Sequence, residues 1–238
     1  GAAAADLLQR GADGVVHKPL EPELLVHAAA AALDRRSLSR AMNAMSAARN
    51  AGPVLQLLGE IVAAFEKADP YRAGFSARTA RLSVAIGSAL SLDTEKLALA
   101  ARVHDVGMLA VPVTEQHANA RPNRPAQHLI RVHPTLGARW VERLGADRTI
   151  VAAVAAHHER WDGGGYPGGL AGADIPPEAR VLGTAAAIAA MASSRPWREK
   201  RDIEEVLAQL TQGSGSQFPP QEAAAAAEVL RKIPTILG

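Results

Sequence analysis

Apolar residues recur every three or four positions along most of this chain, which is the spacing of one buried face of a helix. The pattern predicts a helix from Val54 that ends at 69–71, and a second that carries residues 75 to 90. Further helices are expected from Asp93, whose side chain can cap a helix start, and over the segment that carries residues 129 to 144, with a kink at Pro134. The remaining ones are predicted over 148–159, 178–193, 202–211 and 220–232, and a flexible segment at 213–217 is expected between the last two. No strand pattern follows residue 20, so the expected fold class is all-α, a helical bundle.

The first 36 residues follow a different pattern, in which a short apolar stretch at Val15 lies between two helical segments. The run GADGVVHKPLEPELLVHAAAAAL resembles the end of a response-regulator receiver domain, with Lys18-Pro19 at the close of its last strand. The resemblance implies a short βα receiver remnant that lacks the phosphoaccepting Asp, and an ordinary amphipathic segment is the alternative. The domains expected are therefore a remnant over 1–36, a helical connector over 37–53 that breaks at Gly52-Pro53, and the bundle over 54–238.

Composition narrows the function classes. Aromatic residues make up 3% of the chain, which favours closely packed helices over sheets, and the net charge is +2 without a basic run. We therefore expect no DNA binding. No apolar run reaches the roughly 18 residues of a membrane span, and cysteine is absent, which fits a cytoplasmic protein.

Histidine and aspartate carry the candidate chemistry. The stretch HHERWDGGGYPGG opens with His157 and His158 at a predicted helix end, while His104-Asp105 and His133 lie upstream on other helices. Adjacent imidazoles are costly to bury unless their nitrogens are used, and metals are their commonest users. Imidazole with carboxylate suits Fe, Mn, Zn or Ni, so a metal site inside the bundle is predicted.

These motifs together resemble the HD-GYP domain, a variant of the HD phosphohydrolase superfamily. His104-Asp105 matches the HD pair, His133-Pro134 the HP motif, and HHERWDGGGYPGGLAGADIPPEARVL the long GYP motif, and the likeness covers about 54–232. The resemblance implies an all-α domain that hydrolyses cyclic di-GMP with two or three metals, often iron or manganese. It also implies substrate contacts for a set of residues spread along the chain: Asp69, Gly165, Tyr166, Pro167, Arg195 and Arg198.

Three positions depart from the family pattern. Phe75 stands where the family has a metal-binding His, Ala186 where it has a metal-binding Asp, and Met108 where it has a phosphate-contacting Lys. One family metal site thus keeps only His104 and Asp105. The other keeps all of its ligands, namely Asp105, His133, His157 and His158. We therefore expect one divalent transition metal, with Fe or Mn favoured, and no complete two-metal site.

Three functions remain open at this point. The favoured one is a degenerate signalling domain that binds cyclic di-GMP or a partner protein, with weak or no hydrolysis. The second is an active metal-dependent cyclic di-GMP phosphodiesterase, which the intact GYP segment supports. The third is a purely structural dimerisation module, in which the connector at 37–52 pairs with its copy in a homodimer.

Overall fold

The computed structural model describes residues 51–237 apart from 68, 70, 112–129 and 195–197. The elements in chain order are α3 (Ala51–Lys67), α4 (Phe75–Ala89), α5 (Thr94–Val103), η1 (Val106–Ala110), α8 (His133–Arg143), α9 (Arg148–Ala156), η2 (Gly172–Asp174), α10 (Pro177–Met191), α11 (Ile203–Gly213), α12 (Pro220–Lys232) and η3 (Pro234–Leu237). No strand occurs in these ranges, so the all-α prediction is confirmed for the described part. The expected receiver remnant and nearly all of the connector lie outside it.

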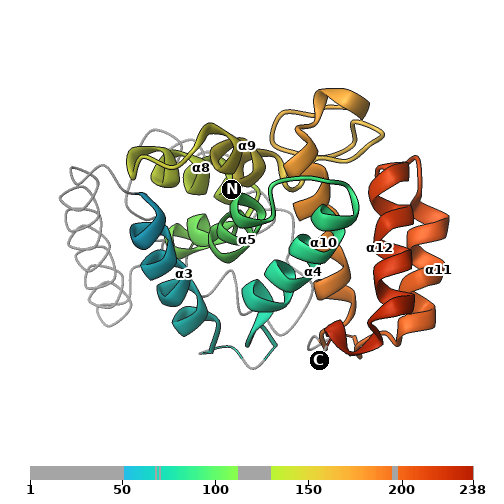
Figure 1. The fold of residues 1–238 in the computed structure, drawn as a ribbon. Coiled ribbons are helices and arrows are strands. Elements are labelled where there is room, and N and C mark those ends of the chain that lie inside the picture. Colours follow the sequence, from blue (N-terminus) through green and yellow to red (C-terminus); the bar gives the residue numbers. More distant parts are fainter. Residues whose placement is uncertain (1–50, 68, 70, 112–129, 195–197, 238) are drawn as a thin grey trace, which may run out of the picture.

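The helices form two groups, which can be followed in Figure 1, and each group packs around an apolar core. In the first, α3, α5, α8 and α9 bury side chains that include Leu58, Val141 and Val154. In the second, α4, α10, α11 and α12 bury others that include Ile86 and Leu230. Because α10 packs against both α4 and α9, it joins the two halves, and the chemistry-bearing residues lie where the halves meet.

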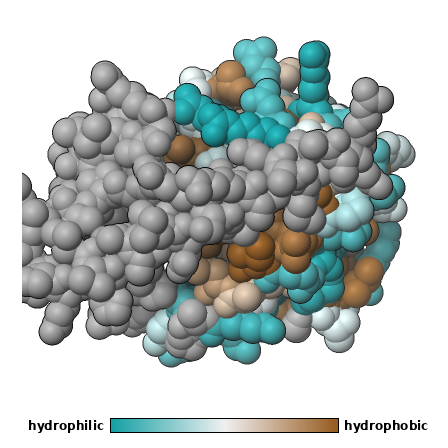
Figure 2. Space-filling view, turned by 90° about the vertical axis from the view of Figure 1, so that its left-hand side faces the viewer, coloured by the Kyte–Doolittle hydropathy of each residue, from teal (hydrophilic) through white to brown (hydrophobic). Residues whose placement is uncertain are grey.

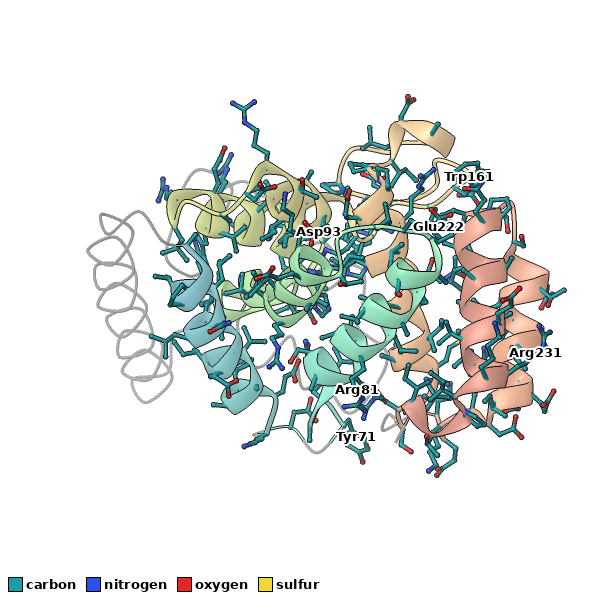
Figure 3. The ribbon with its side chains drawn as sticks, in the orientation of Figure 1. Tyr71, Arg81, Asp93, Trp161, Glu222 and Arg231 are labelled. Atoms are coloured by element: carbon teal, nitrogen blue, oxygen red, sulfur yellow. The ribbon has the colours of Figure 1, made fainter. Side chains whose placement is uncertain are left out.

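Two acidic side chains fix helix starts. Asp93 accepts hydrogen bonds from the backbone N–H of Glu95 and Lys96, which confirms the predicted cap of α5 (Figure 3). Glu66, at the end of α3, is buried and accepts from both the backbone N–H and the hydroxyl of Ser76 in the first turn of α4. Burial raises the pKa of this carboxyl, although the bonds from Ser76 act against it.

Four details of the predicted elements are wrong. Gly52 and Pro53 are helical within α3 instead of breaking it, because a proline in a first turn lacks only an N–H that has no intrahelical partner. Pro134 likewise lies in the first turn of α8 and does not kink a longer helix, since turn residues precede His133. The helix that begins at Arg148 ends at Ala156, three residues early. The segment 213–217, expected to be flexible, closes as a turn in which Gly213 O accepts from Phe218 N at 2.9 Å.

Figure 2 shows the face on the α3 side, where hydrophobic side chains gather among hydrophilic ones. Leu57 of α3 is 49% exposed. The protein partner and the homodimer remain predictions. Among the described helices, none is long and apolar enough to cross a membrane.

Candidate metal centre

Four ligand groups converge where the two halves of the bundle meet. One donor atom each from Asp105, His133, His157 and His158 lies within 4.8 Å of the others. All four ligand residues lie at or just beyond helix ends: Asp105 follows α5, His133 begins α8, and His157 and His158 follow the last residue of α9. This is the ligand set predicted for a single metal, and sequence positions up to 53 residues apart contribute to it.

Backbone carbonyls orient two of the imidazoles. Nδ1 of His133 lies 2.7 Å from Ile130 O, and Nδ1 of His157 lies 2.7 Å from Val154 O. A carbonyl only accepts hydrogen bonds, so each Nδ1 carries a proton, and in the neutral ring Nε2 is then an unprotonated donor to metal.

The free nitrogens face one another and the carboxylate. His133 Nε2 lies 3.2 Å from His157 Nε2 and 3.2 Å from Asp105 Oδ1, and His157 Nε2 lies 3.8 Å from the same oxygen. Electron-rich atoms this close repel unless a cation lies among them. Two ligands at right angles on bonds of about 2.1 Å are about 3 Å apart, so the arrangement fits a metal ion.

The titration of these groups favours metal binding. Burial, and then the neighbouring imidazoles, lowers the pKa of His157 well below its ordinary value. Burial and the nearby His133 lower the pKa of His158 to about 3. Burial alone would raise the pKa of Asp105, but His104, Arg72 and His133 together outweigh it and hold that pKa well below its ordinary value. Near neutral pH His157 and His158 are therefore neutral imidazoles and Asp105 is a carboxylate, the forms that bind metals.

Two apolar side chains lie near the cluster. Phe75 and Ala186 line the same cavity as the four ligand residues, and the Phe75 ring centroid is 5.7 Å from that of His104. His104 lies outside the four-residue group, with its Nε2 3.6 Å from Asp105 Oδ1. Its role as a ligand remains a prediction. Asp105 Oδ2 instead accepts from Arg72 Nη2 at 2.5 Å, a partner that sequence reasoning missed because 33 residues separate the two.

A cavity of about 470 Å³ opens above the cluster. Its lining includes the four ligand residues, Met108, Gly165 and Tyr166, and four arginines: Arg72, Arg131, Arg160 and Arg180. The Tyr166 ring stacks on the His158 ring, with the two ring centroids 4.7 Å apart. The Arg131 guanidinium lies over the Tyr166 ring, 5.0 Å from its centroid. Positive charge and a stacking surface suit an anionic, aromatic ligand.

The glycine-rich loop that forms one wall is tightly held. Glu159 accepts from the backbone N–H of Gly168 at 2.6 Å and of Leu170 at 3.1 Å. A Cβ on Gly165 would lie 2.4 Å from Arg160 N, so only glycine allows this close approach. The turn at 213–217 supports the loop, since Ser216 O accepts from Asp162 N at 2.9 Å.

An ion pair connects the same wall to α12. Arg180 Nε lies 3.0 Å from Glu222 Oε1, and its guanidinium is 5.9 Å from the Trp161 ring centroid. Trp161 and Glu222 lie close together at this end of the molecule (Figure 3). The wall is thus tied to the helical core at a second point.

Other residues predicted to contact substrate lie away from the cavity lining. Asp69 accepts from Tyr71 N at 2.9 Å, and Pro167 is exposed after a cis peptide bond. Arg198 donates to the carbonyl of Ala190 at 2.8 Å, at the end of α10. Arg195 lies outside the described residues. Their contacts with substrate remain predictions.

Comparison with known proteins places the chain in a family. The model of the HD domain family matches residues 62–221. The chain belongs to the HD domain family. The likeness read from the HD and GYP motifs is thereby confirmed at this level.

Curated relatives of this HD domain are cyclic-dinucleotide phosphodiesterases by name. The cyclic di-GMP phosphodiesterase response regulator RpfG of Xanthomonas campestris pv. campestris is 30% identical over 70% of this chain and 45% of its own length. The 3'3'-cGAMP-specific phosphodiesterase 3 of Vibrio cholerae is 29% identical over 73% of the chain and 39% of its length. The chain thus spans less than half of these relatives.

Solved structures show the same fold. A cyclic GMP-AMP specific phosphodiesterase of Vibrio cholerae, V-cGAP3, superposes with a TM-score of 0.60 at 20% identity, over 77% of this chain and 50% of that one. Bd1817 of Bdellovibrio bacteriovorus, described as an HDG"Y"P protein, gives 0.55 at 23% identity, over 66% and 51%.

Proposed function

We propose that this HD domain is a signalling module that holds one transition metal ion and binds a cyclic dinucleotide, with weak or no hydrolysis. The observation that carries the proposal is the asymmetry around Asp105. Oδ1 faces the Nε2 atoms of His133, His104 and His157 at 3.2, 3.6 and 3.8 Å, whereas Oδ2 accepts from Arg72. Phe75 and Ala186, whose side chains have no donor atoms, line the same cavity.

The residues present can perform binding. Asp105, His133, His157 and His158 would hold the ion, with iron or manganese favoured, and a bound ion supplies Lewis acidity toward a phosphate oxygen. Tyr166 offers a ring for stacking beside a purine, and Arg131 and Arg180 supply positive charge to the phosphates. The relatives' names support guanine-containing cyclic dinucleotides as the ligand class.

Hydrolysis needs more than the cluster offers. Two metal ions can stabilise both the attacking and the leaving oxygen of an in-line displacement, and one ion cannot do both. Met108, where the family has a lysine, adds no donor for the phosphate. An active phosphodiesterase remains the second candidate, because the relatives bear that name and the GYP wall is fully formed.

Incubation with a cyclic dinucleotide tests the proposal. The protein would be loaded anaerobically with Fe(II), and separately with Mn(II), then given cyclic di-GMP or 3'3'-cGAMP while chromatography follows the nucleotides. We expect intact substrate, with binding detected by calorimetric titration. A linear dinucleotide or mononucleotide product that the His157→Ala variant fails to make would establish the active enzyme instead. Absence of both binding and turnover would overturn the nucleotide assignment.

A further inference from the structure

The two carboxylate oxygens of Asp105 have different partners. Oδ1 faces the Nε2 atoms of His133, His104 and His157 at 3.2, 3.6 and 3.8 Å. Oδ2 faces the guanidinium of Arg72, with Nη2 at 2.5 Å. A carboxylate can bridge the two ions of a two-metal centre when each of its oxygens faces one of them. Here one of those two sites holds a side-chain cation.

The position of Arg72 is fixed by its own turn. Its backbone N–H donates to Asp69 O at 2.9 Å, and its carbonyl accepts from Phe75 N at 2.9 Å. The side chains of Arg72 and Asp105 are only 13% and 10% exposed. Since a shielded, charge-assisted bond of this length is much stronger than a surface pair, the guanidinium is held against the carboxylate.

The surroundings of Arg72 exclude a second metal ion in two further ways. Phe75, three residues on, and Ala186 provide no donor atoms, and both line the same cavity. Of the potential ligands near Arg72 among the described residues, Oδ2 of Asp105 is already bound by the guanidinium, and His104 Nε2 faces Oδ1 instead, at 3.6 Å. Both oxygens of the nearby Glu66 carboxylate accept hydrogen bonds from Ser76. The donor set therefore does not fit a second ion.

From this arrangement we infer that the Arg72 guanidinium takes the place of a second metal ion, so that the centre is mononuclear with a fixed organic cation beside it. The inference rests on the single-metal site of the proposed function. A guanidinium is charged at any physiological pH and only donates hydrogen bonds. It balances Asp105 and attracts phosphate oxygens, but it carries no water that could be deprotonated for attack. Binding without turnover follows from that difference.

Restoring ligands tests whether Arg72 is the excluding group. We compare the wild type, the Phe75→His/Ala186→Asp double variant, and the same double variant with Arg72→Ala. Each is loaded anaerobically with Mn(II), freed of excess metal by gel filtration, and analysed for metal per chain by mass spectrometry. Electron paramagnetic resonance then distinguishes single ions from exchange-coupled pairs.

We expect about one ion per chain in the wild type, about one in the double variant and about two in the triple variant, with exchange-coupled pairs in the triple variant alone. A matched control adds Arg131→Ala to the double variant, because Arg131 lines the cavity without a bond to Asp105. That control should stay at one ion. Two ions in the double variant, or one in a folded triple variant, would refute the role of Arg72. A wild type with no metal would instead overturn the metal site of the proposed function.

Single substitutions at Arg72 test the inference independently if the triple variant does not fold. Removing the positive charge beside Asp105 in Arg72→Ala should tighten binding of the one Mn(II) ion by about tenfold, because two cations no longer share one carboxylate. Arg72→Lys keeps the charge and should stay near the wild type. Weaker Mn(II) binding in Arg72→Ala would show that the arginine only positions Asp105, and the inference would fail.

Discussion

Gly107 brings the residue pair His104-Asp105 close to His133, and an alanine there should damage the metal centre without touching a ligand. A Cβ at this position would lie 2.0 Å from His133 O and 2.8 Å from Gly137 N. Both are backbone atoms, so no side-chain rotation relieves the contact. Ordinary Cβ contacts begin at 3.4 Å, so the start of α8 must recede from η1 by about 1.4 Å, the difference between the two distances.

That displacement is large on the scale of metal coordination. Ligand distances in a well-formed site vary by only about 0.2 Å, and His133 supplies a donor 3.2 Å from both Asp105 Oδ1 and His157 Nε2. We expect Gly107→Ala to weaken metal binding by about 10- to 100-fold, the range seen when the support of a ligand is lost. Overpacking should also cost about 1–3 kcal/mol of stability.

Competition for Mn(II) against a fluorescent chelator measures the affinity, and urea unfolding of the metal-free protein measures the stability. Gly87→Ala is the matched control, because its Cβ would meet Leu97 Cδ1 at 2.2 Å, the end of a flexible side chain. Gly87 lies twelve residues along α4 from Phe75, so the control should lose stability while keeping its affinity. A folded Gly107→Ala protein with wild-type affinity would refute the reasoning.

Three further predictions concern the described residues. In the metal-free protein, the pKa of His158 is about 3 when folded and 6.5 as its ordinary value, so the unfolded chain binds the extra proton. The free energy of unfolding should therefore fall as the pH drops below 6.5, by up to about 2 kcal/mol at pH 5. Urea unfolding of the His158→Gln variant should show a shallower fall with pH. The same pH dependence in the variant and the wild type would contradict this. Glu66→Ala leaves the Ser76 N–H of α4 without its acceptor and should cost about 1–3 kcal/mol in urea unfolding, with metal content unchanged; equal stability would show that the cap contributes nothing. Glu159→Ala removes the acceptor of two loop N–H groups, and amide exchange at Gly168 and Leu170 should accelerate while exchange in α4 stays constant; unaltered protection would mean that other contacts hold the loop.

Local patterns in the sequence predict the helices and the types of the candidate ligands. Helical spacing of apolar residues is a local property, and so is the Asp93 cap, whose acceptor and donors lie within three residues. The pairs His104-Asp105 and His157-His158 can be recognised in the sequence. The family pattern around them predicts which metal-ligand positions are retained. The prediction of helix bounds failed at Pro53 and Pro134. A proline is tolerated in the first turn of a helix but breaks a helix in its interior, so its effect depends on where the helix begins.

The different partners of the two Asp105 oxygens follow from tertiary packing and not from any local pattern. No local sequence pattern predicts the pairing of Arg72 with a carboxylate 33 residues away. Nor does any local pattern predict that position 107 needs a glycine because the backbone of α8 lies so close to it. Contacts of this kind depend on the packing of helices distant in sequence, and they are fixed when the apolar cores close. The sequence indicates the candidate metal ligands, whereas the folded arrangement of distant segments brings the Arg72 guanidinium to Oδ2 of Asp105.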